Sequence, residues 1–270
     1  MVLWFSSKSP HGLAQRNAND LPLIRQHMIN YTSSLEKIEF LLSFCISLRK
    51  KFLYAPIPKV AHTTIKKTLF TLEMSEAGLT YEGNVHDCLA SPFILPYQLP
   101  DSMLHEIFLK HTYFKFTFIR NPIDRIASGY LDKISNTTNE RKIERAYFEK
   151  MLGADENTEI TLVDFLSVLR KTPPDAMDLH FKPQSDVILS NTIDYDFIGS
   201  MDSLDTELPM ILSKIYNKPY NEIQVTNVTH HATNASNKIP SVFTEQRAYD
   251  LAEEIYKDDF KLYQSVISKQ

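Results

Sequence analysis

Cysteine is scarce in this chain of 270 residues, which holds only Cys45 and Cys88. Two cysteines are too few for the disulfide framework that stabilises small secreted domains. We therefore expect both thiols to be reduced and to be buried as small apolar side chains. This expectation favours a reducing compartment.

Long apolar runs and a strong excess of one charge are also missing. Residues 38–48 are apolar but include Glu39 and end at a basic run, and a membrane-spanning helix needs roughly 20 residues. Residues 1–12 lack the basic start of a signal peptide, so none is expected there. Since no apolar run is long enough to span a bilayer, no membrane anchor is expected either. The net charge of −4 offers no surface for nucleic acid, so any anion site must be local.

Strand patterns and helix patterns alternate along the chain. Residues 51–56 form a compact apolar run that predicts a buried strand, and helical spacing follows from Thr63. Residues 113–119 predict a second strand, and a second helix follows Asn121 and Pro122. The connection 76–100 carries several glycines and prolines, which predicts a long irregular loop over the surface.

The flanking segments complete the expected fold. A short helix is predicted over 35–48, a helix with a capping box at Thr161 and Asp164, a strand over 193–197, and a long amphipathic helix from Thr244. Such alternation predicts an α/β fold with a mainly parallel central sheet flanked by helices. Residues 1–50 are interpreted as an N-terminal lead-in and helix, and residues 51–270 as one domain.

A candidate anion site lies where the first strand meets its helix. It comprises Pro58, Lys59, Val60, Ala61, His62, Thr63 and Thr64. Free backbone N–H groups and the helix dipole favour an anion there, and Lys59 adds a positive charge. The glycine-rich Walker sequence is absent, which disfavours a nucleoside triphosphatase. A capped helix with a surface lysine remains the alternative.

A second candidate site follows the second strand. Arg120 ends that strand and Ser128 lies two turns into the next helix, so a guanidinium and a hydroxyl can converge on one phosphate. The alternative is a salt-bridging arginine with an exposed serine.

Together the two segments resemble a known family. IPKVAHTT (57–64) and FIRNPIDRIASGYLDK (118–133) are similar to the two nucleotide-binding signatures of Golgi-type carbohydrate sulfotransferases. That family comprises the chondroitin, dermatan and HNK-1 sulfotransferases, their bacterial relatives and, more distantly, the heparan 2-O-sulfotransferases. Weaker similarity appears in MDLHFKPQSDVIL (177–189), IDYDFIGSMDSLDTEL (193–208), HHATNASNK (230–238) and IYKDDFKLY (255–263). The resemblance covers residues 51–263.

The resemblance implies a P-loop-like three-layer fold and a sulfotransferase. The donor would be 3'-phosphoadenosine-5'-phosphosulfate (PAPS), the acceptor a carbohydrate hydroxyl and the released product adenosine 3',5'-bisphosphate, with no metal required. Lys59 and its loop through Thr64 would hold the 5'-phosphosulfate, Arg120 and Ser128 the 3'-phosphate, and the loop at Lys238 would cover the nucleotide.

Two positions depart from the family pattern. His62 replaces a small residue or cysteine, and Asn121 replaces the commoner aspartate.

Transfer to a sugar hydroxyl calls for a general base, and neutral histidine suits that task. His86 is the first candidate because related heparan enzymes carry their base in the region after the phosphate loop. His180 is the second, and His62, His230 and His231 are also considered. A purely structural role stays open for each. Lys59 would stabilise the leaving phosphate.

Two other functions remain open, a non-catalytic nucleotide-binding module and a small-molecule kinase. The eukaryotic relatives are anchored in the Golgi, whereas this sequence shows no anchor. We therefore expect a cytoplasmic enzyme of bacterial type, with the Golgi lumen as the alternative.

Overall fold

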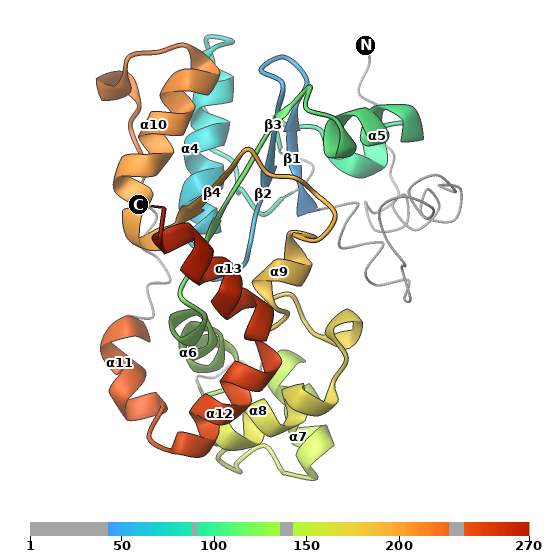
Figure 1. Ribbon diagram of the computed structural model, residues 1–270, viewed down its shortest axis with the longest axis vertical. Helices are drawn as coiled ribbons and strands as arrows, with labels where there is room; N and C mark the ends of the chain where they lie inside the picture. The colour runs from blue at the N-terminus through green and yellow to red at the C-terminus, as the bar shows by residue number, and fades with distance from the viewer. Residues whose placement is uncertain (1–42, 88–90, 136–142, 227–234, 270) are drawn as a thin grey trace.

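The computed structural model describes residues 43–87, 91–135, 143–226 and 235–269. At its centre lies a four-stranded sheet in the order β1 (Cys45–Ser47), β2 (Phe52–Ala55), β3 (Phe114–Ile119) and β4 (Phe197–Ser200). Strands β2, β3 and β4 are parallel, and β1 pairs antiparallel with β2. The mainly parallel sheet is therefore confirmed, and helices pack around it (Figure 1).

The longer helices are α4 (His62–Ser75), α5 (Asp101–Leu109), α6 (Pro122–Lys133), α7 (Ile143–Leu152), α8 (Leu162–Lys171), α10 (Leu204–Tyr216), α11 (Ala235–Val242), α12 (Gln246–Ile255) and α13 (Lys257–Ile267). Shorter helical turns are η2 (Pro96–Gln98), η3 (Pro174–Ala176), α9 (Gln184–Val187), η4 (Met201–Ser203) and η5 (Tyr220–Glu222). None of the helices in the described ranges combines the length and the apolar composition that crossing a bilayer requires.

Buried apolar side chains form two cores. The first joins the sheet to α4, α5 and α10, with Phe52 and Phe116 at its centre. The second joins α6, α7, α8 and α12, with Phe148 and Phe165 among its members. In Figure 1 the second core lies below the carboxyl ends of the parallel strands, and α13 runs between the two. The loops that follow β2 and β3 therefore meet where the two cores adjoin, and in parallel α/β sheets this is where ligands bind.

Several predicted elements are confirmed. Strands occur at 52–55 and 114–119, and helices begin at His62 and Pro122 as the pattern indicates. The capping box is also present, because Thr161 Oγ1 accepts from the Asp164 backbone N–H at 3.1 Å and Asp164 accepts from the Thr161 N–H. Cys45 is a free, buried cysteine, whereas Cys88 lies outside the described residues.

The predicted helix over 35–48 is wrong for its last residues. Cys45–Ser47 forms strand β1, and Ile46 exchanges two backbone hydrogen bonds of 3.0 Å with Ile94 on its other side. All three strand residues are buried, so this apolar run is covered on both faces instead of presenting one helical stripe. Residues 1–42, which hold the rest of the lead-in, lie outside the described residues.

Three further predictions need correction. The strand expected over 193–197 begins only at Phe197. The C-terminal helix is broken at Tyr256, whose non-helical backbone separates α12 from α13 and whose hydroxyl donates to the Phe181 carbonyl at 2.6 Å. The connection 76–100 contains η2 and buries Tyr81, Val85 and Phe93, so its described part is not a loose surface loop.

Candidate functional site

The loop between β2 and α4 has an unusual backbone. Lys59 and Ala61 adopt left-handed conformations, with φ of 68° and 47°, although neither is glycine. Such a conformation costs about 1–2 kcal/mol for an L-residue with a β-carbon, so surrounding contacts must hold it. Helix α4 that follows has no side-chain cap and no acidic residue in its first turn. Its first N–H groups, which have no partner within the helix, can therefore serve an anion.

Two arginines hold this loop from the side of β3 and α6. Arg120 donates from Nη1 to the Lys59 carbonyl at 3.2 Å, and Arg125 donates from Nε to the Pro58 carbonyl at 3.1 Å. Burial lowers the pKa of both guanidinium groups, while nearby carboxylates, among them Asp259 for Arg125, act in the opposite direction. An arginine keeps its proton under such conditions, so both remain cations.

The backbone of Arg120 is fixed from a distant part of the chain. The Gln184 side chain accepts from the Arg120 N–H and donates to the Arg120 carbonyl, both at 2.9 Å. Gln184 is fixed in turn, because the Asp259 carboxylate on α13 accepts from the N–H groups of Gln184 and Ser185 at 2.7 and 2.8 Å.

The Lys59 ammonium group points toward a carboxylate on α6. Its Nζ lies 3.3 Å from Asp132 Oδ2, and the lysine side chain is only 11% exposed. Burial lowers the pKa of Lys59, whereas the charge of Asp132 raises it. The protein therefore keeps this cation beside residues 58–64, which we call the phosphate-type loop, with a carboxylate as its present partner.

Histidines lie beside the same loop. The rings of His62 and His86 meet edge to face with their centroids 5.2 Å apart, and His86 Nε2 lies 3.2 Å from Thr63 Oγ1. Burial lowers the pKa of His62 to about 3, and the charges of His86, Lys66, His180 and Lys59 act in the same direction. His62 is therefore neutral near pH 7.

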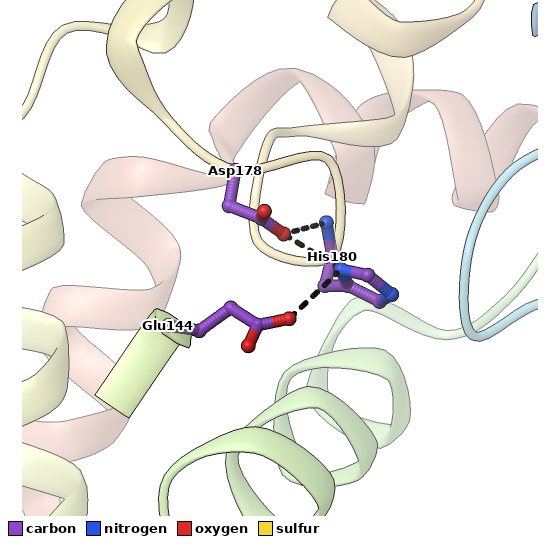
Figure 2. A group of neighbouring side chains, drawn as sticks. All are labelled: Glu144, Asp178 and His180. Atoms are coloured by element: carbon purple, nitrogen blue, oxygen red, sulfur yellow. Dashed lines mark hydrogen bonds and ion pairs between the residues drawn. The ribbon is translucent and has the colours of Figure 1, made fainter. Parts of the chain in front are cut away.

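His180 is held next to the loop by Arg125. The guanidinium group that binds the Pro58 carbonyl also donates to the carbonyls of Leu179 and Lys182, at 2.9 and 2.8 Å. These two carbonyls flank His180 in the chain. Figure 2 shows the His180 ring with Asp178 and Glu144 directed toward it, at 2.6 and 4.0 Å from its Nδ1.

The structure thus brings most of the predicted site residues together. The loop 58–64, Arg120, His86 and His180 gather at the carboxyl ends of β2 and β3, and Ser128 is buried on α6. The backbone of Lys238 belongs to α11, but its side chain lies outside the described part of the chain, as do His230 and His231.

Other residues of this site were not singled out from the sequence. They are Arg125, Asp132, Glu144, Asp178 and Gln184. Asp178 could have been noticed, because an aspartate two residues before a histidine can cap the turn that carries it. The other four act across sequence separations that a local pattern does not reveal.

The arrangement suits anion binding next to a proton acceptor. Lys59 and Arg120 supply positive charge beside an open helix N-terminus, and imidazole groups lie within electrostatic range of them. Within the described ranges, one group has the spacing of metal ligands, namely Glu144, Asp178 and His180. The Lys133 ammonium group lies 2.8 Å from Glu144 and compensates its charge. These three residues and Lys133 therefore form a chain of polar contacts in which Glu144 already has a cation as its partner.

Comparison with known proteins connects this site to one family. The Sulfotransferase family profile matches residues 42–264. Carbohydrate sulfotransferase 14 of Danio rerio is 29% identical over 199 residues, which cover 70% of this chain and 52% of that protein. The Mus musculus protein of the same name is 27% identical over 183 residues, covering 65% of this chain and 47% of that protein. Carbohydrate sulfotransferase 10 of Danio rerio is 26% identical over 183 residues, which cover 61% of this chain and 50% of that protein.

The chain therefore spans about half the length of the curated relatives that it matches. No solved structure matches it. The resemblance seen in the sequence is confirmed, since the family match runs from just before β1 into α13 and includes every element that builds the site. The chain belongs to the sulfotransferase family.

Proposed function

We propose that this chain transfers a sulfuryl group from PAPS to a hydroxyl group of a carbohydrate. The observation that carries the proposal is the strained loop after β2, which presents Lys59 at an uncapped helix N-terminus and is bound by the Arg120 side chain. The acceptor class is supported by the relatives, which are named carbohydrate sulfotransferases. A strand, phosphate-type loop and helix in this order also support a P-loop-like fold.

The charges around the loop fit the proposed donor. Bound PAPS would supply the sulfuryl group, and the loop 58–64 would hold its 5'-phosphosulfate. Arg120 and Ser128 would hold the 3'-phosphate, and Lys238 would contribute to covering the nucleotide. Both Arg120 and Ser128 are buried on or next to α6, where a fixed guanidinium and a hydroxyl can serve one phosphate.

Lys59 would act on the leaving group. In the structure its ammonium group is paired with Asp132 and is largely shielded from solvent. A bound phosphosulfate would compete with Asp132 for this cation, which could then stabilise the negative charge that develops on the 5'-phosphate. A histidine of the cluster would take the acceptor proton. The sequence favours His86, and His180 is its rival.

Nucleotide binding and product formation together test the proposal. Calorimetry should show adenosine 3',5'-bisphosphate binding more tightly than adenosine 5'-monophosphate, and mass spectrometry should show glycans gaining one sulfate when PAPS is supplied. A magnesium-dependent preference for ATP would indicate the kinase instead. Tight binding of the bisphosphate without any sulfated product from a broad glycan panel would favour a binding module.

A further inference from the structure

His180 has a fixed backbone position beside the phosphate-type loop. Arg125 ties the flanking carbonyls of Leu179 and Lys182 to Pro58, as described above. On the other side, a β-carbon built on Gly129 would lie 3.3 Å from the His180 carbonyl oxygen. Gly129 therefore permits this close approach to α6, one residue after Ser128. The imidazole is thus carried on a segment that cannot shift independently of the loop.

The ring is also fixed in its orientation. Asp178 Oδ1 accepts a hydrogen bond from the His180 backbone N–H at 2.8 Å and lies 2.6 Å from His180 Nδ1. Burial raises the pKa of Asp178, but hydrogen bonds and charge from His180 outweigh burial and hold that pKa below its ordinary value. An ionised carboxylate can only accept, so Nδ1 must carry the hydrogen of the neutral ring. The lone pair then resides on Nε2, which points away from both carboxylates in Figure 2.

A second carboxylate completes the surroundings. Glu144 Oε1 on α7 lies 4.0 Å from Nδ1, and Lys133 on α6 lies 2.8 Å from the same carboxylate. Among the described residues, the charged groups near His180 include the two carboxylates, the Lys133 ammonium group that pairs with Glu144, and the Arg125 guanidinium that binds the flanking carbonyls. The neutral ring of His62 also lies within electrostatic range of His180. This is the environment that holds an imidazole in one tautomer.

We infer that Asp178 is a positioning residue that fixes His180 in the Nδ1–H tautomer, so that Nε2 is the atom that takes the acceptor proton. The inference rests on the proposed sulfuryl transfer. As the acceptor oxygen bonds to sulfur, its proton passes to Nε2, and the bond from sulfur to the 5'-phosphate oxygen breaks. The electron pair of that bond stays on the phosphate oxygen next to Lys59, and the imidazolium ion later releases its proton to solvent.

The neighbouring histidine is engaged differently. His86 directs its Nε2 toward Thr63 Oγ1 at 3.2 Å, and its backbone N–H is held by Asn84 Oδ1 at 2.9 Å. That ring therefore contacts the loop 58–64 through one of its two nitrogens, and no carboxylate contact comparable to that of Asp178 fixes its tautomer among the hydrogen bonds described. On this geometry His86 serves the loop, and His180 serves the acceptor.

The test compares Asp178→Asn and His180→Ala with a matched surface pair. His111 Nε2 and Asp194 Oδ2 lie 3.8 Å apart on side chains that are 73% and 84% exposed, before β3 and β4, at the end of the sheet opposite the site. The variants His111→Ala and Asp194→Asn are therefore the controls. Each protein is assayed for kcat and for the KM of PAPS, with a glycan from the panel that wild type sulfates as the acceptor, and for affinity toward adenosine 3',5'-bisphosphate. Long-range ¹H–¹⁵N NMR reports the tautomer of His180.

We expect His180→Ala to lower kcat by about 10² to 10⁴-fold, the effect of losing an acid–base group. Asp178→Asn should lower kcat by about 10 to 10⁴-fold, from the cost of removing the partner of a metal-bound histidine up to that of removing the carboxylate that orients a general-base histidine. Neither substitution should change the affinity for adenosine 3',5'-bisphosphate by more than about threefold, and this unchanged affinity also verifies that each variant is folded. The variant Asp178→Glu, which keeps a carboxylate, should recover part of the kcat that Asp178→Asn loses. Wild-type NMR should show hydrogen on Nδ1, and the two control variants should keep full activity.

Three results would overturn the inference. They are an Nε2–H tautomer in the wild type, unchanged kcat in Asp178→Asn, or an active His180→Ala variant beside an inactive His86→Ala variant. Failure of the proposed function is a separate outcome, because wild-type protein would then form no sulfated product while the NMR spectrum still decides the tautomer.

Discussion

Arg125 offers the sharpest test of how the site is assembled. The residue is 2% exposed, and its side chain donates three hydrogen bonds, to the carbonyls of Pro58, Leu179 and Lys182. The substitution Arg125→Lys keeps the charge but replaces a planar group with three donor directions by a single ammonium group. The three arginine bonds leave from three different nitrogens, so we expect the single nitrogen of lysine to keep one of these carbonyl contacts and to lose two.

The magnitude follows from those two lost bonds. A hydrogen bond to a charged group contributes about 1.5–3 kcal/mol, so Arg125→Lys should lower the free energy of unfolding by about 3–6 kcal/mol. This is a large part of the roughly 5–15 kcal/mol that stabilises a typical protein. Affinity for adenosine 3',5'-bisphosphate should fall as well, because the phosphate-type loop loses its anchor to α6.

Equilibrium unfolding in urea, followed by circular dichroism, measures the effect as a shift in midpoint at constant slope. Arg170→Lys is the matched control, since Arg170 pairs with Glu254 at the surface, with side chains 47% and 53% exposed. That control should change the free energy of unfolding by no more than about 0.5 kcal/mol. A loss below about 1 kcal/mol for Arg125→Lys, or an equal loss in both variants, would refute the anchoring role.

Three further predictions concern the donor site and its pH dependence. Lys59→Ala should lower turnover by about 10² to 10³-fold while bisphosphate affinity falls less, and wild-type turnover in this variant would remove Lys59 from the mechanism. Ser128→Ala should weaken calorimetric binding of adenosine 3',5'-bisphosphate but not of adenosine 5'-monophosphate, and equal losses would contradict its 3'-phosphate assignment. Arg120→Ala should weaken binding of both nucleotides, and of the bisphosphate more, because the Arg120 side chain also holds the Lys59 carbonyl. Burial lowers the pKa of His62 to about 3 in the folded protein, whereas a histidine in the unfolded chain has a pKa near 6.5. The unfolded chain therefore binds a proton at this position more readily than the folded protein does, and the free energy of unfolding falls as pH drops below about 6.5. Between pH 7 and pH 5, wild type should lose up to about 2 kcal/mol of unfolding free energy more than His62→Gln, and identical losses would show that His62 is not buried neutral.

The parts of the fold that the sequence predicts well are those governed by local rules. The start of α8 at Leu162 depends on a capping box, which was predicted and found. The sequence also indicated a helix after Asn121 and Pro122, and α6 begins at Pro122, where a proline suits the first helical position. The loop 58–64 could be located because a strand pattern passes into a helix pattern over a few residues. Its left-handed residues, Lys59 and Ala61, give no sign in the sequence, because glycine, the usual marker, is absent.

The parts that the sequence predicts poorly depend on contacts across the chain. Residues 45–47 become a strand because partners on both sides, in β2 and at Ile94, supply hydrogen bonds. The C-terminal helix breaks at Tyr256 because its hydroxyl reaches Phe181 and because Asp259 binds the amides of Gln184 and Ser185. A helical repeat of apolar residues carries no information about either contact. The contact between Asp178 and His180 differs from these, because it spans only two residues and an aspartate at that spacing is a local signal that was missed.

The bracing of Gln184 by Asp259 has a consequence for how the protein matures. Gln184 holds Arg120 in place, and Asp259 lies on α13, so the position of Arg120 depends on residues that leave the ribosome long after the loop 58–64 has been made. Contacts between residues so distant in sequence form slowly and late. A nascent chain stalled before residue 259 should therefore hold a phosphate-type loop that cannot yet grip its ligand, and gain of nucleotide binding should coincide with the docking of the last helix. Under the proposed function, capture by an immobilised nucleotide should therefore retain completed chains and release chains that are stalled before residue 259.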